Sequence, residues 1–393
     1  MRSTFLSNHL SKHPSSSDDD SVTSSTPLAS SESSVDMGHY LWIPVLISLS
    51  KEFVVARSAG DQLNSSNTLK LLSHGSSDTS SVPKCLFPDP SLNYRPVIGI
   101  LSHPGDGALG RLNKDEGTSY IAASYVKFVE SAGARVIPLI FNEPREILFQ
   151  KLSLVNGVLF TGGWNQSGPY FEMVKDIFSK SLAINDKGVH FPLYAICLGF
   201  ELLTKIVSKD DKILESFNAA VRGSTLQFAE DIDINGTVFQ RFPPELLRKL
   251  ETNCLAMQKH RYGISPELFQ KNCNLRSFFK VITTSEDDDG KAYVSTVQAR
   301  NYPITAFQWH PEKNAFEWGL PLIPHSEDAI HVTQLVANFF ISEARKSTIR
   351  PDEPDVLDNL IYNYSPTYCG KAGKGYDEVY LFERHKQLMI SKV

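Results

Sequence analysis

The stretch Phe191-Pro-Leu-Tyr-Ala-Ile-Cys197-Leu-Gly-Phe-Glu201 decides the fold that we expect for this chain. A short apolar run leads into Cys197, and residues 199–207 follow with the composition of a helix. This order predicts a strand, a sharp turn and a helix, with small residues at Ala195 and Gly199 leaving room for the turn. The dipole at the helix N-terminus favours a thiolate, so the turn would make Cys197 a nucleophile near neutral pH.

The alternative is that Cys197 is a core residue, because free cysteine is often buried. A second stretch, Tyr302-Pro-Ile-Thr-Ala-Phe-Gln-Trp-His310-Pro-Glu312, favours the nucleophile. His310 could take the cysteine proton and return it to a leaving amine, and Glu312 could fix the tautomer of the imidazole. A surface loop with an unrelated histidine and glutamate is the alternative interpretation of this stretch.

A third stretch, Asn156-Gly-Val-Leu-Phe-Thr-Gly162-Gly163-Trp164, is a buried strand that runs into paired glycines. Glycine lets backbone N–H groups approach a ligand closely. The N–H of Leu198 and that of Gly162 or Gly163 could therefore form an oxyanion hole for acyl transfer. An ordinary turn at the end of a strand is the alternative.

Apolar runs and helical periodicities alternate along the chain, which predicts an α/β fold: a doubly wound, mostly parallel sheet flanked by helices in a single catalytic domain. We expect strands at 96–101, 135–140, 157–161 and 193–196, and helices at 118–132, 146–154, 169–185 and 325–346. We expect an antiparallel strand at 294–298, and a solvated hairpin tip, not a metal site, at the acidic residues 286–290. The glycine pair, Cys197 and His310 all follow strands, and chemistry gathers at the carboxyl ends of strands in such sheets.

The composition of the N-terminal region predicts that the protein enters the secretory route. Residues 1–36 are Ser-rich and are expected to be a disordered extension. Residues 37–60 carry an apolar run of signal-peptide length followed by small residues, with Met37 as a true or alternative start. A buried helix or an interfacial stretch is the alternative for this run. Residues 61–93 are expected to be a linker, and residues 94–393 the catalytic domain. Sequons begin at Asn64, Asn165, Asn235 and Asn363.

The composition sets further bounds. The chain has 393 residues, of which 41% are hydrophobic and 21% charged, with a net charge of -5. These values are typical of a globular protein and give no sign of nucleic-acid binding. The five cysteines show no paired CxxC spacing, so a zinc site is not expected. If Cys197 stays a thiol, two disulfides among the other four are possible.

Taken together, the motifs resemble a known superfamily. Cys-Leu-Gly-Phe-Glu at 197–201, Gln-Trp-His-Pro-Glu-Lys at 308–313 and Phe-Thr-Gly-Gly at 160–163 resemble the class I glutamine amidotransferase-like proteins. Within them, the chain is similar to the gamma-glutamyl hydrolase family from about residue 94 to 382. The superfamily usually has glycine two positions before the cysteine, where this chain has Ala195. The further matching stretches are 120–136, 260–265, 316–318, 338–346 and 360–368.

The resemblance implies the roles of individual residues. Cys197 is expected to be the nucleophile, His310 the catalytic base and acid, and Glu312 the third member of the triad. His260 matches a second family histidine near the site and is a candidate for substrate binding. The resemblance also implies that no cofactor or metal is needed.

The same resemblance implies a substrate and a setting. The expected substrate is a folylpoly-gamma-glutamate, and the expected assembly is a homodimer in a vacuole, a lysosome-like lumen or the extracellular space. Arg and Lys should meet the substrate carboxylates; the candidates are Lys205, Arg222, Lys259 and Arg261. Two rival hypotheses are a glutaminase subunit that supplies ammonia to a synthetase, and a non-catalytic binding protein of the same fold.

Overall fold

The computed structural model describes residues 88–370 and 375–383. The expected extension at 1–36, the signal peptide at 37–60 and nearly all of the linker at 61–93 lie outside the described residues. The described residues all belong to one compact unit, which contains every element named below.

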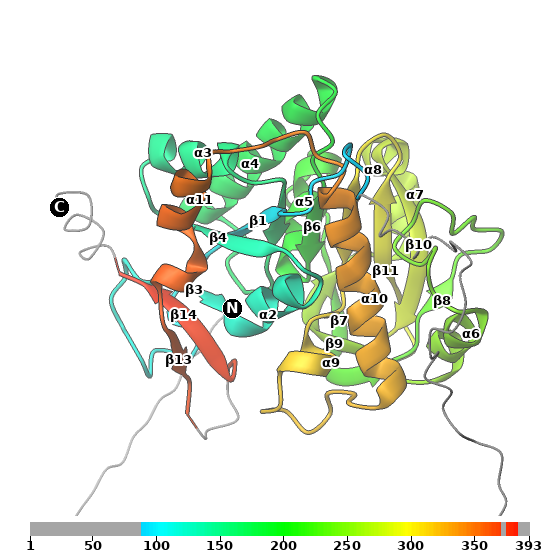
Figure 1. Cartoon of the computed structure of the whole chain (residues 1–393). Coiled ribbons are helices and arrows are strands. Elements are labelled where there is room, and N and C mark those ends of the chain that lie inside the picture. Colours follow the sequence, from blue (N-terminus) through cyan, green and yellow to red (C-terminus); the bar gives the residue numbers. More distant parts are fainter. Residues whose placement is uncertain (1–87, 371–374, 384–393) are drawn as a thin grey trace, which may run out of the picture. The chain divides into compact units, whose positions relative to one another are not determined.

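The strands and helices follow one another along this unit (Figure 1). The strands are β1 (Val97–Leu101), β2 (His103–Pro104), β3 (Ser119–Ala122), β4 (Arg135–Leu139), β5 (Gly157–Phe160), β6 (Leu193–Ile196), β7 (Glu215–Ser224), β8 (Gln227–Phe228), β9 (Ala256–Gly263), β10 (Phe279–Glu286), β11 (Ala292–Ala299), β12 (Ile304–Phe307), β13 (Pro366–Tyr368) and β14 (Glu378–Phe382). The helices are α2 (Ala123–Ser131), α3 (Arg145–Ser153), α4 (Gly168–Asp186), α5 (Leu198–Ser208), α6 (Pro244–Thr252), α7 (Pro266–Lys271), α8 (Cys273–Phe278), α9 (Lys313–Phe316), α10 (Glu327–Ala344), α11 (Glu353–Asn359) and the 3-10 turn η1 (Ile361–Asn363).

The central sheet has the strand order β4-β1-β5-β6-β12-β11-β10-β8. The pairs from β4 to β12 are parallel, and β11, β10 and β8 extend the sheet in antiparallel fashion. The expected doubly wound sheet is therefore confirmed. The antiparallel strand expected at 294–298 is the middle of β11, and residues 286–290 lie at the tip of the β10–β11 hairpin as expected.

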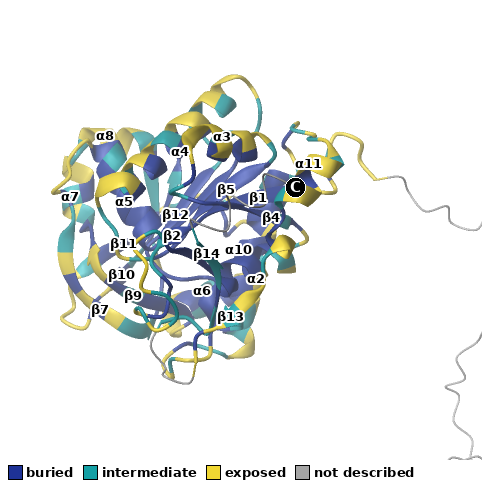
Figure 2. Cartoon of the chain, turned by 90° about the vertical axis from the view of Figure 1, so that its left-hand side faces the viewer, coloured by how far each residue is buried: buried dark blue, intermediate teal, exposed yellow. Residues whose placement is uncertain are grey.

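Helices cover both faces of the sheet because each strand alternates its apolar side chains between two cores. On β1, Ile98 and Ile100 belong to the core that α2 and α10 complete. Val97 and Leu101 belong to the core built with α3, α4 and α5. Figure 2 shows the result, in which the buried strands lie between the two layers of helices and the outer faces of the helices are exposed.

The helix expected at 118–132 is wrong over its first residues. Ser119–Ala122 is strand β3, and α2 begins only at Ala123. The reason is tertiary, because β3 pairs antiparallel with β14, which lies far along the chain, and with β2. The end of the helix was predicted correctly, since Gly133 follows it with φ of 84°.

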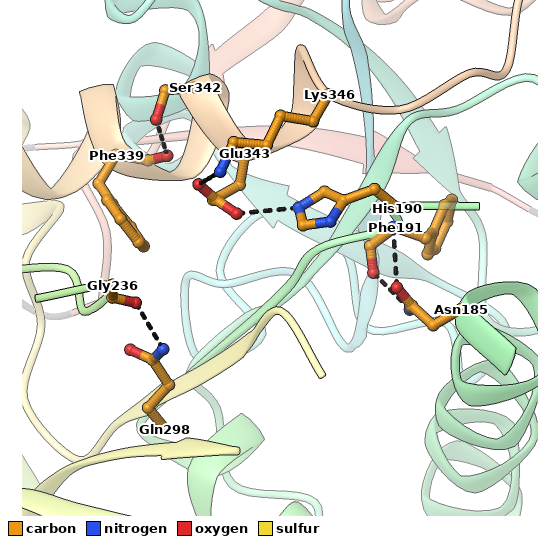
Figure 3. A network of polar contacts seen from close by, with 9 residues as sticks. All are labelled: Asn185, His190, Phe191, Gly236, Gln298, Phe339, Ser342, Glu343 and Lys346. Atoms are coloured by element: carbon orange, nitrogen blue, oxygen red, sulfur yellow. Dashed lines mark hydrogen bonds and ion pairs between the residues drawn. The ribbon is translucent and has the colours of Figure 1, made fainter. Parts of the chain in front are cut away.

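Polar contacts fix the segment that leads into β6 (Figure 3). The Asn185 amide nitrogen donates to the carbonyl oxygens of Ser181 (2.9 Å) and Phe191 (2.8 Å), and the amide oxygen accepts from the Phe191 N–H (3.0 Å). His190 Nε2 lies 2.9 Å from Glu343 Oε2 on α10. The start of the strand that carries Cys197 is thus tied to the end of α4 and to α10.

We predict that Asn185→Ala lowers the free energy of unfolding by about 1–3 kcal/mol, because it leaves buried backbone groups at the start of β6 without partners. Urea unfolding followed by tryptophan fluorescence measures the change. The matched control is Ser179→Ala, which removes an exposed hydrogen bond on the same helix and is expected to cost less than about 0.5 kcal/mol. Equal losses in the two variants would contradict the role given to Asn185.

Candidate active site

The turn between β6 and α5 holds Cys197 in an unusual conformation. Its φ of 53° and ψ of -102° lie in a region that side chains rarely adopt. Its N–H donates to the carbonyl oxygen of Phe307 (2.7 Å), and α5 begins at the next residue. A Cβ at Gly199 would lie 2.9 Å from the carbonyl oxygen of Phe160. The predicted turn and its requirement for a small residue at 199 are confirmed.

The ends of three neighbouring strands, β5, β6 and β12, bring the predicted residues together. A Cβ placed on Gly162 would lie 2.9 Å from His310 Cε1 and 3.4 Å from Cys197 Cβ. Cys197 and His310 also line the same cavity of about 380 Å³. The lining residues of this cavity are Gly107, Leu109, Tyr120, Gly163, Trp164, Cys197, Lys259, His310, Gly375 and Tyr376.

His310 and Glu312 form a buried pair beside the cavity. His310 Nδ1 lies 2.8 Å from Glu312 Oε1, and no described group makes a hydrogen bond to His310 Nε2. Burial lowers the pKa of His310, although the neighbouring Glu312 carboxylate opposes this effect. Burial alone would raise the pKa of Glu312, but His310 and Lys313 hold it below its ordinary value. The pair therefore presents a neutral ring, with Nδ1 donating to the carboxylate and the lone pair of Nε2 available to accept a proton.

The Cys197 sulfur is protonated in this state. Burial raises the pKa of the thiol well above its ordinary value, and the carboxyl groups of Glu201 and Glu312, when they are ionised, raise it further. Its Sγ donates to the carbonyl oxygen of Lys259 (3.7 Å). A thiolate favoured by the helix terminus was expected, and burial outweighs that effect here. The proton must therefore leave during the reaction, and apo sites often show such catalytic contacts unformed.

The backbone donors expected for an oxyanion hole are not equivalent. The Gly162 N–H donates to the Tyr125 hydroxyl oxygen (2.8 Å), so it is already engaged. Gly163 lines the cavity, and the Leu198 N–H faces the sulfur and lowers the pKa of the thiol. The N–H groups of Gly163 and Leu198 are therefore the better candidates for the oxyanion hole.

His103 was not predicted as a site residue, although it holds the glycine turn. Its Nε2 accepts from the N–H groups of Trp164 (3.2 Å) and Asn165 (3.3 Å), and its Nδ1 contacts the Pro104 carbonyl oxygen (2.8 Å). A Cβ on Gly163 would lie 2.3 Å from the His103 ring, so only glycine fits there. Burial lowers the pKa of His103 to about 4, which keeps Nε2 an acceptor. The signal in the sequence was a histidine two residues after the end of the first strand.

His260 does not line the cavity. On β9, its Nδ1 contacts the Tyr262 carbonyl oxygen (3.0 Å) and its Nε2 contacts Gln258 Oε1 (3.2 Å). Burial lowers its pKa to about 3. Both ring nitrogens are therefore engaged within the protein, and the expected contact of His260 with substrate has no support in this geometry.

The four cationic candidates are placed differently. Lys259 lines the cavity. Lys205 is buried and donates to the Gln166 carbonyl oxygen (2.9 Å), and Arg222 is paired with Asp288. Arg261 is exposed and is not part of the cavity wall.

The remaining chemical expectations concern cysteines, metals and membranes. Cys254, Cys273 and Cys369 are free thiols, so two disulfides that spare Cys197 are not formed. Among the described residues, no group of three or more His, Cys, Asp or Glu is arranged to hold a metal ion. In the same part of the chain, no helix combines the length and the apolar character needed to cross a membrane.

Glu201, one turn into α5, is a second residue that the motif analysis did not single out. Its Oε2 accepts from the Gln166 amide nitrogen (2.6 Å), and its Oε1 lies 3.5 Å from the Gln308 amide nitrogen. Burial raises the pKa of Glu201 to about 8, in spite of these contacts and of Lys205. A carboxyl group that holds its proton near neutral pH therefore lies behind the Cys197 turn.

Comparisons with known proteins identify similar sequences and structures. The family model described as Peptidase C26 matches residues 96–312. The chain is 61% identical over 354 residues to "Gamma-glutamyl hydrolase 2" of Arabidopsis thaliana, covering 90% of this chain and 100% of that protein. It is 64% identical over 317 residues to "Gamma-glutamyl hydrolase 1" of the same plant, covering 81% of this chain and 91% of that protein. A glutamine amidotransferase structure from Thermotoga maritima covers 64% of this chain and 99% of its own, with a TM-score of 0.37 and 14% identity.

The fold and the family match define a hydrolase of the α/β class, with a cysteine at the end of a strand of the central, mostly parallel sheet. The chain belongs to the gamma-glutamyl hydrolases of the peptidase C26 family, so the resemblance drawn from its motifs is confirmed.

We predict that Glu201→Gln stabilises the protein increasingly as the pH rises. The folded pKa of about 8 lies above the ordinary 4.5, so the stabilisation from the protonated carboxyl is complete below about pH 4.5. It is lost as the pH rises towards 8, at a rate of up to about 1.4 kcal/mol per pH unit. Glutamine has the shape of the protonated acid and does not titrate. Gln308 Oε1, for which the described residues offer no hydrogen-bond partner, can accept from the new amide nitrogen at position 201 after the Gln308 side-chain amide rotates.

Urea unfolding of both proteins at pH 5 and pH 8 measures this effect. The difference in unfolding free energy should be small at pH 5 and should favour the variant at pH 8. A difference that stays the same at both pH values would show that Glu201 does not titrate in this range.

Proposed function

We propose that this hydrolase cleaves gamma-glutamyl amide bonds of folylpoly-gamma-glutamates through a covalent acyl-enzyme. The observation that carries the proposal is the buried His310–Glu312 pair, which faces the same cavity as Cys197 at the ends of three neighbouring strands. The relatives are named gamma-glutamyl hydrolases, which supports a gamma-glutamyl bond as the bond that is cleaved. The family resemblance of the motifs supports the folate part of the substrate.

The reaction begins with proton transfer from the Cys197 thiol to Nε2 of neutral His310. The thiolate attacks the amide carbonyl carbon and forms a tetrahedral intermediate, whose oxyanion accepts from the Leu198 and Gly163 N–H groups. His310 then gives the proton to the departing amine nitrogen, the C–N bond breaks, and a thioester remains on Cys197.

Hydrolysis of the thioester uses the same groups in reverse. His310 takes a proton from water, and the hydroxide attacks the thioester carbonyl carbon. The second tetrahedral intermediate collapses, the C–S bond breaks, and the proton on His310 returns to the sulfur. The free carboxylic acid leaves and the thiol is restored.

Glu312 makes each proton transfer possible. Burial disfavours a charged imidazole, as the lowered pKa of His310 shows. A carboxylate 2.8 Å from Nδ1 stabilises the imidazolium that forms after each transfer, and it keeps the proton of the neutral ring on Nδ1. The imidazole is thus neutral at rest, and the Glu312 carboxylate stabilises its positive charge when a proton is transferred to Nε2.

The proposal includes the setting of the enzyme. The protein enters the secretory route through a signal peptide at residues 37–60 and acts as a homodimer in a vacuole, a lysosome-like lumen or the extracellular space. The apolar run at 37–60, the sequons and the family resemblance support this. Mass spectrometry of the mature N-terminus and sedimentation of the purified protein test the two parts separately.

We predict that Cys197→Ala lowers kcat/KM for folate pentaglutamate by at least about 10⁴-fold, because the covalent step is lost. Glu312→Gln should lower kcat by about 10²- to 10⁴-fold, since the imidazolium loses its balancing charge. Chromatography of the products over time measures both rates and shows the position of cleavage.

The matched control is Cys254→Ala, which removes an exposed thiol and should leave the rate unchanged. Wild-type cleavage by the Cys197→Ala variant would refute the mechanism. A wild-type protein that hydrolyses free glutamine and leaves folate pentaglutamate intact would favour the glutaminase hypothesis instead.

A further inference from the structure

The cavity beside Cys197 has an uneven distribution of charge. Most of its lining residues are aromatic, aliphatic or glycine, and none carries a carboxylate. His310 is held neutral by burial. Among the described residues that line the cavity, Lys259 therefore supplies the cationic side chain.

Lys259 is not neutralised by an ion pair. Within residues 88–370 and 375–383, no carboxylate lies within 4.0 Å of its ammonium nitrogen. Burial and the neighbouring Lys313 lower the pKa of Lys259, and the acidic residues that oppose this effect, Glu317 and Glu312, have partners of their own. Glu312 contacts His310, and Glu317 accepts from the Asp377 N–H (3.0 Å).

Lys259 also lies next to the reacting atom. Its carbonyl oxygen accepts from the Cys197 sulfur at 3.7 Å, so β9 runs alongside the nucleophile at this residue. Its side chain is partly buried and forms part of the cavity wall. A substrate whose carbonyl carbon reaches Cys197 therefore occupies the cavity that Lys259 helps to line.

The proposed substrate has charges at the corresponding place. In a gamma-linked polyglutamate, every residue keeps a free α-carboxylate, so one carboxylate lies on each side of the scissile amide. The one on the leaving side is attached to the carbon that bears the scissile nitrogen. Moving such an anion into a partly enclosed cavity is costly unless a cation meets it there.

We propose that Lys259 determines specificity by binding an α-carboxylate next to the scissile amide. The inference rests on the proposed function and deepens it, since it assigns the recognition of the gamma-glutamyl unit to one residue. It also explains why the other three candidates are not needed at this position, because their cationic groups lie outside the cavity wall.

A purely local role for Lys259 makes a different prediction. The ammonium could act only by stabilising the Cys197 thiolate, since the two charges influence each other. In that case removal of the charge would slow every substrate equally. In the proposed role, removal penalises a substrate that carries the recognised carboxylate and spares one that lacks it.

The experiment compares Lys259→Met and Lys259→Arg with the wild-type protein on three substrates. The parent is p-aminobenzoyl-gamma-diglutamate, and each analogue has one α-carboxylate, on the acyl or the leaving side, converted to a carboxamide. We expect wild-type kcat/KM to fall about 10- to 100-fold for one analogue. Lys259→Met should lose a similar factor on the parent, mainly through KM, with no further loss on that analogue, and Lys259→Arg should keep most of the activity.

Two controls complete the test. Lys271→Met removes an exposed cation at the end of α7 and should leave all three rates unchanged. The rate at which iodoacetamide, an uncharged reagent, alkylates Cys197 reports the thiolate by itself and should change less than about threefold in Lys259→Met.

The possible outcomes distinguish failure of the role proposed for Lys259 from failure of the proposed function. If Lys259→Met discriminates among the three substrates as the wild-type protein does, the inference is overturned. The same holds if alkylation falls by the same factor as all three rates. If the wild-type protein cleaves neither the parent nor folate pentaglutamate, the proposed function itself fails.

Discussion

The backbone at Cys197 is the constraint on which the rest of the site depends. A non-glycine residue with φ of 53° costs about 1–3 kcal/mol and persists only where its surroundings enforce it. Here the enforcing contacts are the hydrogen bond from the Cys197 N–H to Phe307 and the start of α5 directly after the turn. Because Phe307 ends β12, the same contact that holds the cysteine also fixes the segment leading to His310.

Most of the buried ionisable groups discussed at this edge of the sheet are held in their uncharged forms. The Cys197 thiol is protonated, and His310 and His103 are neutral, because burial penalises their charged forms. Glu312 is the exception, and it is charged because His310 and Lys313 surround it. The reacting thiol and imidazole are therefore uncharged at rest, and the fixed N–H groups and the Glu312 carboxylate act when charge develops on them during the reaction.

The sequence was sufficient to predict the parts of the molecule that local patterns determine. The apolar runs into Gly162, Cys197 and His310 predicted three strand ends at one edge, and the structure brings two of these side chains into one cavity. The strand at 119–122 was missed because its pairing partner, β14, is distant in sequence. His103 and the raised pKa of Cys197 were missed for a similar reason, since both depend on burial by segments that no local pattern identifies.

The way the cavity is completed has a consequence for biosynthesis. Gly375 and Tyr376 form part of its wall, and β14, which follows them, pairs with β3. A ribosome releases residues in order, so the sheet that carries the cysteine can assemble while this wall has yet to emerge. The cavity wall is therefore complete only after almost the whole domain has been translated.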